Sequence, residues 1–391
     1  MQKNPTENPS VLILGDHAIG LRMAFARALD DLGVRVTVAH PPGLTLEPGS
    51  PRIRTVEYPV DARHVVRASR AVRDLRRETR SAVVHAFSTL PATISGLASR
   101  RDPDGCYVRT VNGLGRSFST TGMRGTAMRL AYSGVMIALD RRVRCAVFQN
   151  HDDDAWFAHN AFLRGRRHQV ILGSGADTVS FDPASISADR RDAARTFLGA
   201  DGRPTALLIS RHLRSKGVDD LSAAAQLCGV RTDQAMVFAV VGPPSDNPRD
   251  MPSATDSHTG SVEFKRLGSW SDIPALLAEA DVVVLPTRYR EGIPRVLIEG
   301  ATMGMPLLAY DVPGCREIVE PGGNGVLVAP GDIEGLACHL VRLLGDPAER
   351  RRLGTRSRTL IEERFDVRLI AAQYADLYAE LSGCSLPPSG P

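Results

Sequence analysis

The sequence has few aromatic residues, scattered cysteines and no long apolar run, and each shortage excludes a class of protein. Phe, Trp and Tyr make up 5% of the 391 residues, which argues against an aromatic stacking platform for single-stranded nucleic acid. The six cysteines form no CxxC pair, a pattern typical of reduced thiols rather than of zinc sites or disulfide frameworks. No apolar stretch approaches the ~20 residues that span a bilayer, and residues 1–10 are too polar for a secretory signal. We therefore expect a cytoplasmic globular protein.

Lysine is scarce as well, because 45 of the 48 basic residues are arginine and only 3 are lysine. Residues 1–180 hold 25 Lys and Arg against 16 Asp and Glu, a balance of +9, whereas residues 181–391 hold 23 against 28, a balance of −5. The basic half contains two arginine clusters, one at 116–144 around an apolar stretch and one made of Arg63, Arg67, Arg70, Arg73, Arg77 and Arg80. Such clusters favour an anionic membrane surface as partner. The alternative is a set of solvated helices in an arginine-rich sequence.

Short β-branched runs alternate with longer segments of helical period along almost the whole chain. The runs lie at 11–14, 34–39, 82–87, 107–111, 143–148 and 169–172, and then at 205–210, 235–241, 262–267, 281–285 and 306–310. This alternation is typical of parallel βαβ units. A connector at 173–175 and 181–188 separates the two series. The sequence therefore predicts two doubly wound α/β units, with ligands at the carboxyl ends of the strands, in the cleft between the units.

The most informative motif is a pair of glutamates in the stretch EGIPRVLIE, which follows the run at 281–285. Pro294 suits the first turn of a helix, so Glu291 would lie before the helix and Glu299 inside it, on the order of 10 Å away. That separation suits two ends of an extended ligand. Between them, Gly292 and the helix N-terminus favour an anion. The motif describes a nucleotide-sugar pocket, with a solvated helix start as the alternative.

A second candidate site is Arg211 with Lys216, which follow the run at 205–210. Two cations at the carboxyl end of a strand can neutralise a diphosphate leaving group. A lysine stands out in this chain, and its compact ammonium can serve as a point charge on phosphate where a guanidinium is too broad. The alternative is two surface charges near a turn.

These motifs carry a family resemblance. The stretch REGIPRVLIEGATMGMPLLAYDVPGCREIV at 290–319 resembles family 4 of the retaining glycosyltransferases, and in particular the bacterial capsular and lipid-linked N-acetylgalactosaminyltransferase type. The segments TVNGLG (110–115), FQNHDD (148–153), GSGAD (173–177) and SRHLRSKGV (210–218) support that subgroup. The resemblance runs from about residue 11 to residue 378.

The resemblance implies a GT-B fold, a division of the chain and a set of site residues. An acceptor-binding Rossmann-like domain would span 1–175 with a returning C-terminal helix at about 370–391, and a donor-binding domain would span 176–369. Glu291 would contact hydroxyls of the transferred sugar and Glu299 the ribose of the donor. Arg211 and Lys216 would hold the diphosphate of a UDP-sugar, helped by backbone amides near Gly292 and Ile293. The family generally works without a metal or other cofactor.

Two departures from the family concern the first domain. The first loop contains no Gly-Gly pair but runs from Gly15 through His17 to Gly20, which disfavours a direct phosphate cradle. It is no G-x-G-x-x-G fingerprint either, which disfavours a nicotinamide cofactor. Asn112 stands where many members place a histidine, so Asn112 and Gly113 are candidates for the acceptor or sugar pocket.

Other polar residues have two readings each. His17 and His85, at strand ends, would polarise an acceptor hydroxyl or be structural. The run Asp152-Asp-Asp154 suggests either a metal-binding DxD or, as we expect, an acidic helix start.

The predicted function is transfer of a hexose or N-acetylhexosamine from a UDP-sugar to a hydroxyl of a lipid-linked saccharide or polysaccharide precursor, with retention. The enzyme would then be cytoplasmic and peripheral at the inner membrane face. Two alternatives stay open. The acceptor would be a soluble natural product, or the protein would bind nucleotide sugars without catalysis.

Overall fold

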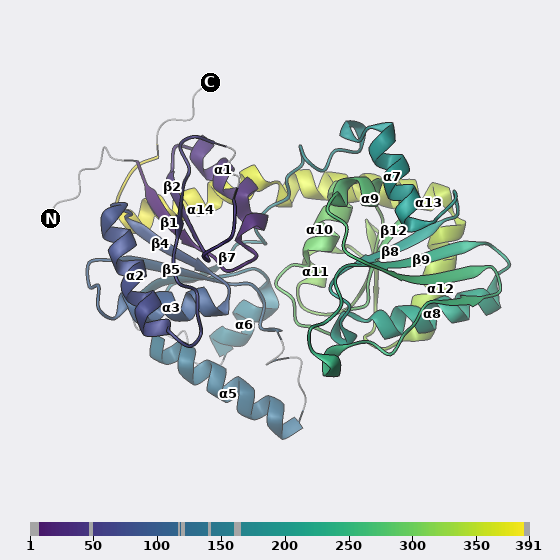
Figure 1. Ribbon diagram of the computed structural model, residues 1–391, viewed down its shortest axis with the longest axis horizontal. Coiled ribbons are helices and arrows are strands. Elements are labelled where there is room, and N and C mark those ends of the chain that lie inside the picture. The colour runs from purple at the N-terminus through teal and green to yellow at the C-terminus, as the bar shows by residue number, and fades with distance from the viewer. Residues whose placement is uncertain are drawn as a thin grey trace. The chain divides into compact units, whose positions relative to one another are not determined.

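The computed structural model describes residues 8–46, 50–115, 118, 122–139, 142–159 and 166–386. The chain divides into two compact units, and both are layered α/β structures (Figure 1). Unit 1 comprises Met1–Gly175 and Phe365–Pro391, and unit 2 comprises Ala176–Arg364. Arg116 and Arg141 of the second arginine cluster lie outside the described residues. The prediction of two doubly wound α/β units is confirmed.

Unit 1 is built on a sheet of seven parallel strands in the order β3-β2-β1-β4-β5-β6-β7. The strands are β1 (Ser10–Leu14), β2 (Arg35–His40), β3 (Arg54–Glu57), β4 (Val83–Phe87), β5 (Cys106–Val111), β6 (Val143–Phe148) and β7 (His168–Val170). The strand order reverses between β1 and β4. The carboxyl ends of these two strands therefore form the switch point at which doubly wound sheets bind ligands.

Helices cover both faces of the unit 1 sheet. They are η1 (Ile19–Arg22), α1 (Met23–Asp31), α2 (Val65–Glu78), α3 (Thr89–Ser99), α5 (Gly122–Leu139), α6 (His151–His159) and α14 (Val367–Ser382). Because side chains alternate along a strand, Val11 and Ile13 of β1 pack with α1 and α14, whereas Leu12 and Leu14 pack with α2 and α3. The C-terminal helix α14 therefore completes the core of unit 1.

His85 is a buried member of a polar network that ties α14 to the sheet. Its Nδ1 lies 2.5 Å from the Tyr378 hydroxyl and its Nε2 lies 2.7 Å from Thr110 Oγ1, which in turn lies 3.2 Å from the Tyr374 hydroxyl. Burial lowers the pKa of His85 well below its usual value, and the nearby Arg22 acts in the same direction. The ring is neutral and fully enclosed, which favours the structural reading of this histidine.

Unit 2 repeats the architecture, with strand order β10-β11-β9-β8-β12-β13-β14. Its strands are β8 (Thr205–Ile209), β9 (Met236–Val241), β10 (Ser257–Thr259), β11 (Val262–Leu267), β12 (Val282–Leu285), β13 (Leu307–Tyr310) and β14 (Gly325–Val328), of which β10 is antiparallel to its neighbour. Its main helices are α7 (Ala188–Leu198), α8 (Val218–Arg231), α9 (Ile273–Ala278), α10 (Arg295–Thr302), α11 (Cys315–Ile318), α12 (Ile333–Gly345) and α13 (Pro347–Leu360). Figure 1 shows α8 and α12 on one side of this sheet and α9 and α10 on the other. Within the described ranges of both units, no helix is long and apolar enough to cross a membrane.

Candidate active site

The predicted donor residues lie at the switch point of the unit 2 sheet. Strand β8 sits between β9 and β12, so the strand order reverses at β8 and β12. Arg211 follows β8, and Lys216 ends the short turn η4 (Arg214–Lys216) that comes next. Glu291 lies in the loop between β12 and α10. Because β8 and β12 are parallel neighbours, their carboxyl ends bring these loops to one edge of the sheet.

Lys216 and Glu291 form an ion pair at this edge. The Lys216 ammonium contacts Glu291 Oε1, and the two side chains are only 23% and 15% exposed. The ammonium also lies 5.3 Å from the centre of the Tyr289 ring, close enough for a cation–π attraction. Thr287 Oγ1 lies 3.4 Å from the same carboxylate oxygen. The structure thus joins two residues that the sequence placed 75 positions apart.

The loop that carries Lys216 is held against the loop that carries Glu291 by backbone contacts. The amide of Arg288 donates to the carbonyl of Ser215 at 2.9 Å. Gly217 has a φ of +79°, and a Cβ added there would lie 2.0 Å from the carbonyl oxygen of Pro286. Only glycine tolerates both this backbone conformation and this close approach. Gly217 therefore allows Lys216 to reach Glu291.

This packing leads to a stability prediction for Gly217→Ala. We expect it to destabilise unit 2 by ~1–3 kcal/mol more than Gly202→Ala, because overpacking adds to the strain of a left-handed alanine. Gly202 is the matched control, since its φ is +77° but an added Cβ would meet nothing within 4 Å. Urea unfolding of both variants measures the difference. Equal destabilisation would show that the contact with Pro286 is unimportant.

The backbone between the two glutamates is enclosed. Gly292 is buried and Ile293 is 9% exposed. Gly314, with a φ of +86°, approaches so closely that a Cβ added there would lie 2.1 Å from the carbonyl oxygen of Gly292. The sequence predicts Pro294 in the first turn of the helix, and this prediction is wrong. The ψ of Pro294 is 120°, which is extended, and α10 begins at Arg295, so Pro294 directly precedes the helix.

Glu299 lies on the first turns of α10 and is 13% exposed. Its Oε1 accepts a hydrogen bond of 2.7 Å from Arg295 Nε. Burial raises the pKa of Glu299, while the charge and hydrogen bond of Arg295 lower it. A carboxylate in this position gains from any further donor, such as a hydroxyl of a ligand.

Arg211 is more open than Lys216. Its Nη2 lies 3.3 Å from Asp246 Oδ2, and the two side chains are 51% and 100% exposed. An exposed pair of this kind contributes little to stability. The Arg211 guanidinium is therefore easily exchanged from Asp246 to a bound anion.

The residues predicted for an acceptor pocket lie at the carboxyl edge of the unit 1 sheet. Gly15 is buried, its carbonyl accepts from the Tyr58 hydroxyl at 2.9 Å, and an added Cβ would lie 2.4 Å from Ile19. His17 is exposed in the turn that follows. Asn112 and Gly113 are half-buried directly after β5, and Gly113 has a φ of +95°. The structure thus assigns Gly15 a packing role and leaves the other three accessible at this edge.

Arg22 connects several loops of this edge, and the sequence analysis missed it. The Asn112 side-chain amide is oriented so that its oxygen faces donors. In this orientation Asn112 Oδ1 accepts from Arg22 Nη2 at 2.8 Å and from the backbone amide of Ser88 at 3.3 Å. The guanidinium also contacts Ser174 Oγ and lies 4.2 Å from the centre of the Phe87 ring. Ser88 adopts a φ of +74°, which is rare for a serine. One arginine among 45 gives no signal that a sequence pattern can isolate.

The acidic run at 152–154 forms the first turn of α6, as expected. Asn150 caps this helix, because its Oδ1 accepts from the amide of Asp153 at 2.8 Å. Asp154 pairs with His168 at 2.6 Å. These contacts account for two of the three aspartates.

The chain is similar in sequence to known glycosyltransferases. Residues 190–360 match the family model of glycosyl transferases group 1. The chain is 26% identical over 269 residues to N,N'-diacetylbacillosaminyl-diphospho-undecaprenol alpha-1,3-N-acetylgalactosaminyltransferase of Campylobacter jejuni, a match that covers 68% of this chain and 69% of that protein. It is 32% identical over 194 residues to alpha-D-kanosaminyltransferase of Streptomyces kanamyceticus, which covers 49% of this chain and only 50% of that protein.

The fold also has close counterparts among solved structures. The Anabaena protein HepE in complex with UDP-glucose superposes with a TM-score of 0.73 at 18% identity, covering 95% of this chain and 99% of that one. Such a likeness concerns the fold, and it confirms the GT-B architecture that the motifs predict. Residues 190–360 therefore form a glycosyl transferases group 1 domain, within a chain of GT-B fold.

Proposed function

We propose that the protein is a retaining glycosyltransferase that moves a hexose or N-acetylhexosamine from a UDP-sugar to a hydroxyl of a lipid-linked saccharide or polysaccharide precursor. One observation carries the proposal: the enclosed Lys216–Glu291 pair lies at the β8–β12 switch point, directly before the helix that bears Glu299. The Campylobacter relative is by name a transferase onto an undecaprenol-linked sugar, and HepE binds UDP-glucose.

Each residue has a distinct role in the proposed donor complex. Glu291 accepts hydrogen bonds from hydroxyls of the transferred sugar, and Glu299 accepts from the ribose. Lys216 and Arg211 hold the diphosphate, with backbone amides near Gly292 and Ile293. Unit 1 provides the acceptor site, for which Asn112 and Gly113 are candidates. The protein's own cations, without a metal or cofactor, stabilise the charge that develops on the leaving group.

The proposed reaction is a substitution at the anomeric carbon. The bond from this carbon to the β-phosphate oxygen breaks, and a bond to the acceptor oxygen forms on the same face of the sugar. The acceptor proton passes to the leaving diphosphate, so UDP and the glycoside are the products. The enzyme contributes positioning and electrostatic stabilisation rather than a nucleophile.

A soluble acceptor is the second candidate. The observation that favours it is the 32% identity to alpha-D-kanosaminyltransferase. Acceptor profiling with lipid-linked and free saccharides separates the two readings.

A nucleotide-sugar screen tests the proposed function. We expect one UDP-sugar to raise the Tm at low concentration, since a ligand that binds only the folded state stabilises it in proportion to RT ln(1 + [L]/Kd). That donor should then be transferred with its anomeric configuration retained, as measured by NMR of the product. Stabilisation without turnover would indicate a binding protein, and inversion would contradict the proposed mechanism.

The buried carboxylate gives a prediction in which stability and binding move in opposite directions. The folded-state pKa of Glu299 is raised, so its stabilising contribution is present at low pH and is lost as pH rises through that pKa. We therefore expect Glu299→Gln to raise the Tm of the ligand-free protein at neutral pH, by more than at pH 4.5. UDP affinity should fall by about tenfold, because a charged hydrogen bond to the ribose is lost.

Glu279→Gln is the control for this experiment, because Glu279 is 10% exposed, close to the 13% of Glu299, and is also paired with arginine but lies outside the site. It should leave UDP affinity unchanged. If Glu299→Gln leaves UDP affinity unchanged as well, the ribose role is wrong.

A further inference from the structure

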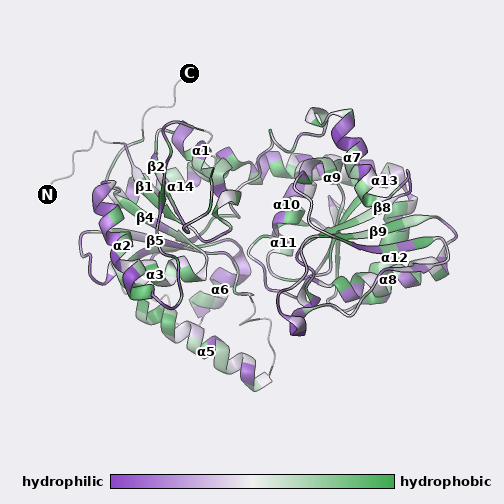
Figure 2. Cartoon of the chain, in the orientation of Figure 1, coloured by the Kyte–Doolittle hydropathy of each residue, from purple (hydrophilic) through white to green (hydrophobic). Residues whose placement is uncertain are grey.

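Helix α5 of unit 1 exposes an apolar face. Met123 is 91% exposed, Leu130 65%, Val135 48% and Ile137 36%. The buried side of the helix is formed instead by Gly125, Ser133, Met136 and Leu139. An ordinary surface helix has polar residues toward solvent, whereas α5 has large apolar residues there as well as on its buried side. Figure 2 shows hydrophobic colour over one part of the helix and pale or hydrophilic colour over the rest.

Five of the exposed residues form one continuous stripe, which Val135 does not join. Met123, Ala127, Leu130, Gly134 and Ile137 follow one another at intervals of four and three residues, which places them on one side of a helix. All five are exposed. The helix is too short and too little apolar to cross a bilayer, but a stripe of this kind suits a helix that lies in the membrane interface.

Positive charge flanks the stripe, and residues 105–144 hold seven arginines against a single acidic residue, Asp140. Residues 105–139 contain no Asp or Glu. Arg124 and Arg129 lie on α5 itself, and Arg129 Nη2 donates to Thr126 Oγ1 at 3.0 Å. Two further arginines, Arg142 and Arg144, follow at the start of β6 and are exposed. This charge complements an anionic lipid surface, whereas a second copy of the helix would bring like charges together.

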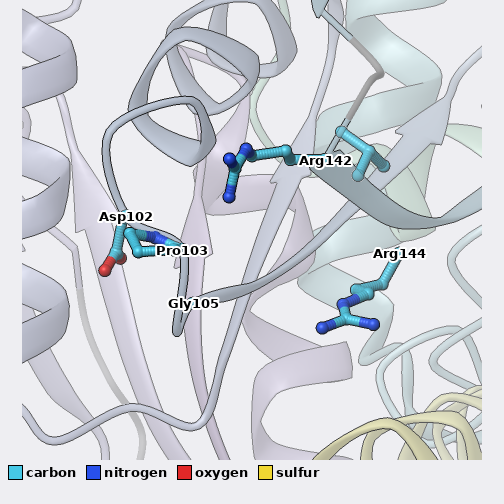
Figure 3. A pocket seen from close by; sticks show the side chains of 6 residues that line it. Asp102, Pro103, Gly105, Arg142 and Arg144 are labelled. Carbon is cyan, nitrogen blue, oxygen red and sulfur yellow. The ribbon is translucent and has the colours of Figure 1, made fainter.

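Arg142 and Arg144 line a pocket at the amino edge of the unit 1 sheet. The pocket has a volume of about 200 Å³ and is lined by Asp102, Pro103, Gly105, Arg142, Val143 and Arg144. Figure 3 shows that the guanidinium groups of Arg142 and Arg144 extend toward the turn that carries Asp102. A guanidinium presents several donors to a phosphate.

The acidic residue of the pocket does not oppose an anion. Asp102 Oδ2 and Oδ1 accept hydrogen bonds of 2.6 and 2.8 Å from Arg76, and the Tyr107 hydroxyl donates to Oδ2 at 2.8 Å. Burial would raise the pKa of Asp102, but these hydrogen bonds outweigh it and lower the pKa. The carboxylate is thus ionised and already neutralised by Arg76, which leaves Arg142 and Arg144 to a ligand.

We infer that α5 docks unit 1 on an anionic membrane, with its apolar stripe in the interface and a lipid phosphate between Arg142 and Arg144. This inference rests on the proposed function, because it explains how a lipid-linked acceptor is reached. Helix α5 connects the parallel strands β5 and β6, so it runs back from their carboxyl edge to their amino edge. A membrane along α5 therefore passes beside the edge that carries Asn112 and Gly113.

Vesicle sedimentation of the full chain tests the inference. We expect binding to phosphatidylcholine vesicles that contain about 30% phosphatidylglycerol, little binding to phosphatidylcholine alone, and release by salt through screening. Leu130→Gln with Ile137→Gln, and separately Arg142→Gln with Arg144→Gln, should each weaken binding by about tenfold or more. All four positions are at least one third exposed, so the fold should be unaffected, which an unchanged Tm verifies.

Matched double variants in unit 2 serve as controls. Val179→Gln with Val230→Gln removes two side chains that are each 78% exposed, and Arg249→Gln with Arg351→Gln removes two exposed charges. Both should bind vesicles like the parent. UDP binding, measured in parallel, should be unchanged in every variant, so a failed donor site and a failed membrane site give different results.

Three outcomes would overturn the inference. The first is equal binding to neutral and anionic vesicles, and the second is unchanged binding in the α5 variants. The third is a dimer that the α5 variants convert to a monomer while vesicle binding persists, which would assign the stripe to a second copy of the chain.

Discussion

Replacing Glu291 by glutamine is expected to lower turnover by at least tenfold while UDP binds almost as before. The side chain is enclosed, 15% exposed, and contacts Lys216. In the proposed role its carboxylate accepts hydrogen bonds from the transferred sugar, and a charged hydrogen bond of this kind contributes ~1.5–3 kcal/mol. UDP lacks that sugar, so its affinity should change less than twofold. Steady-state kinetics and calorimetric titration with UDP give the two numbers.

The chain offers a close control for this variant. Glu263 pairs with Lys265 at 2.9 Å, and these side chains are 16% and 19% exposed, similar to those of the Glu291–Lys216 pair. Glu263 lies on β11, away from the switch point. Glu263→Gln should therefore keep full turnover. Equal turnover of Glu291→Gln and the parent would remove Glu291 from the site.

Replacing Lys216 by glutamine should weaken UDP binding by about 10- to 100-fold and leave uridine binding unchanged. The expected loss corresponds to one charged hydrogen bond to the diphosphate. Arg211→Gln should act in the same direction, because its exposed partner Asp246 competes weakly for the guanidinium. Titration with UDP and with uridine separates the diphosphate from the nucleoside contribution.

Lys265→Gln controls for the loss of a half-buried lysine, since Lys265 donates to Glu263 and to backbone carbonyls outside the site. A second test is the double variant with Glu291→Gln. Because Lys216 and Glu291 touch, their effects on the free energy of unfolding should not add. If Lys216→Gln weakens uridine and UDP equally, the lysine is structural and has no role on phosphate.

The fold was largely predictable from the sequence, and the strands that were missed share one physical feature. The predicted runs correspond to β1, β2, β4, β5, β6 and β7 in unit 1 and to β8, β9, β11, β12 and β13 in unit 2. The missed strands β3, β10 and β14 all lie at the edges of their sheets. The strands β3 and β10 are short and partly exposed, so they lack the buried apolar runs that reveal central strands, whereas β14 is an apolar run of only four residues.

The individual site residues were predictable, but not their contacts. Glu291 and Lys216 stood out by motif and by the rarity of lysine, whereas their pairing depends on Gly217, whose close approach to Pro286 is a property of the folded backbone. Thr287 and Tyr289 complete the surroundings of the pair and carry no sequence signal. Pro294 was placed one position too far into the helix, because proline suits both the first turn and the residue before it.

The position of α14 in the core of unit 1 has a consequence for biosynthesis. The Tyr374 ring packs 5.1 Å from that of Phe25, and residues 367–378 of α14 cover Val11, Ile13 and Val83 of the sheet. These strands leave the ribosome early, but the helix that covers them is made only after the whole of unit 2, which is continuous over 176–364. Domains usually mature in the order of their synthesis, and here that order is reversed. Until α14 is made, only η1 and α1 among the described helices pack on this face, so nascent chains carry a partly uncovered apolar sheet face throughout the translation of unit 2, and that interval is the one in which chaperones are most needed.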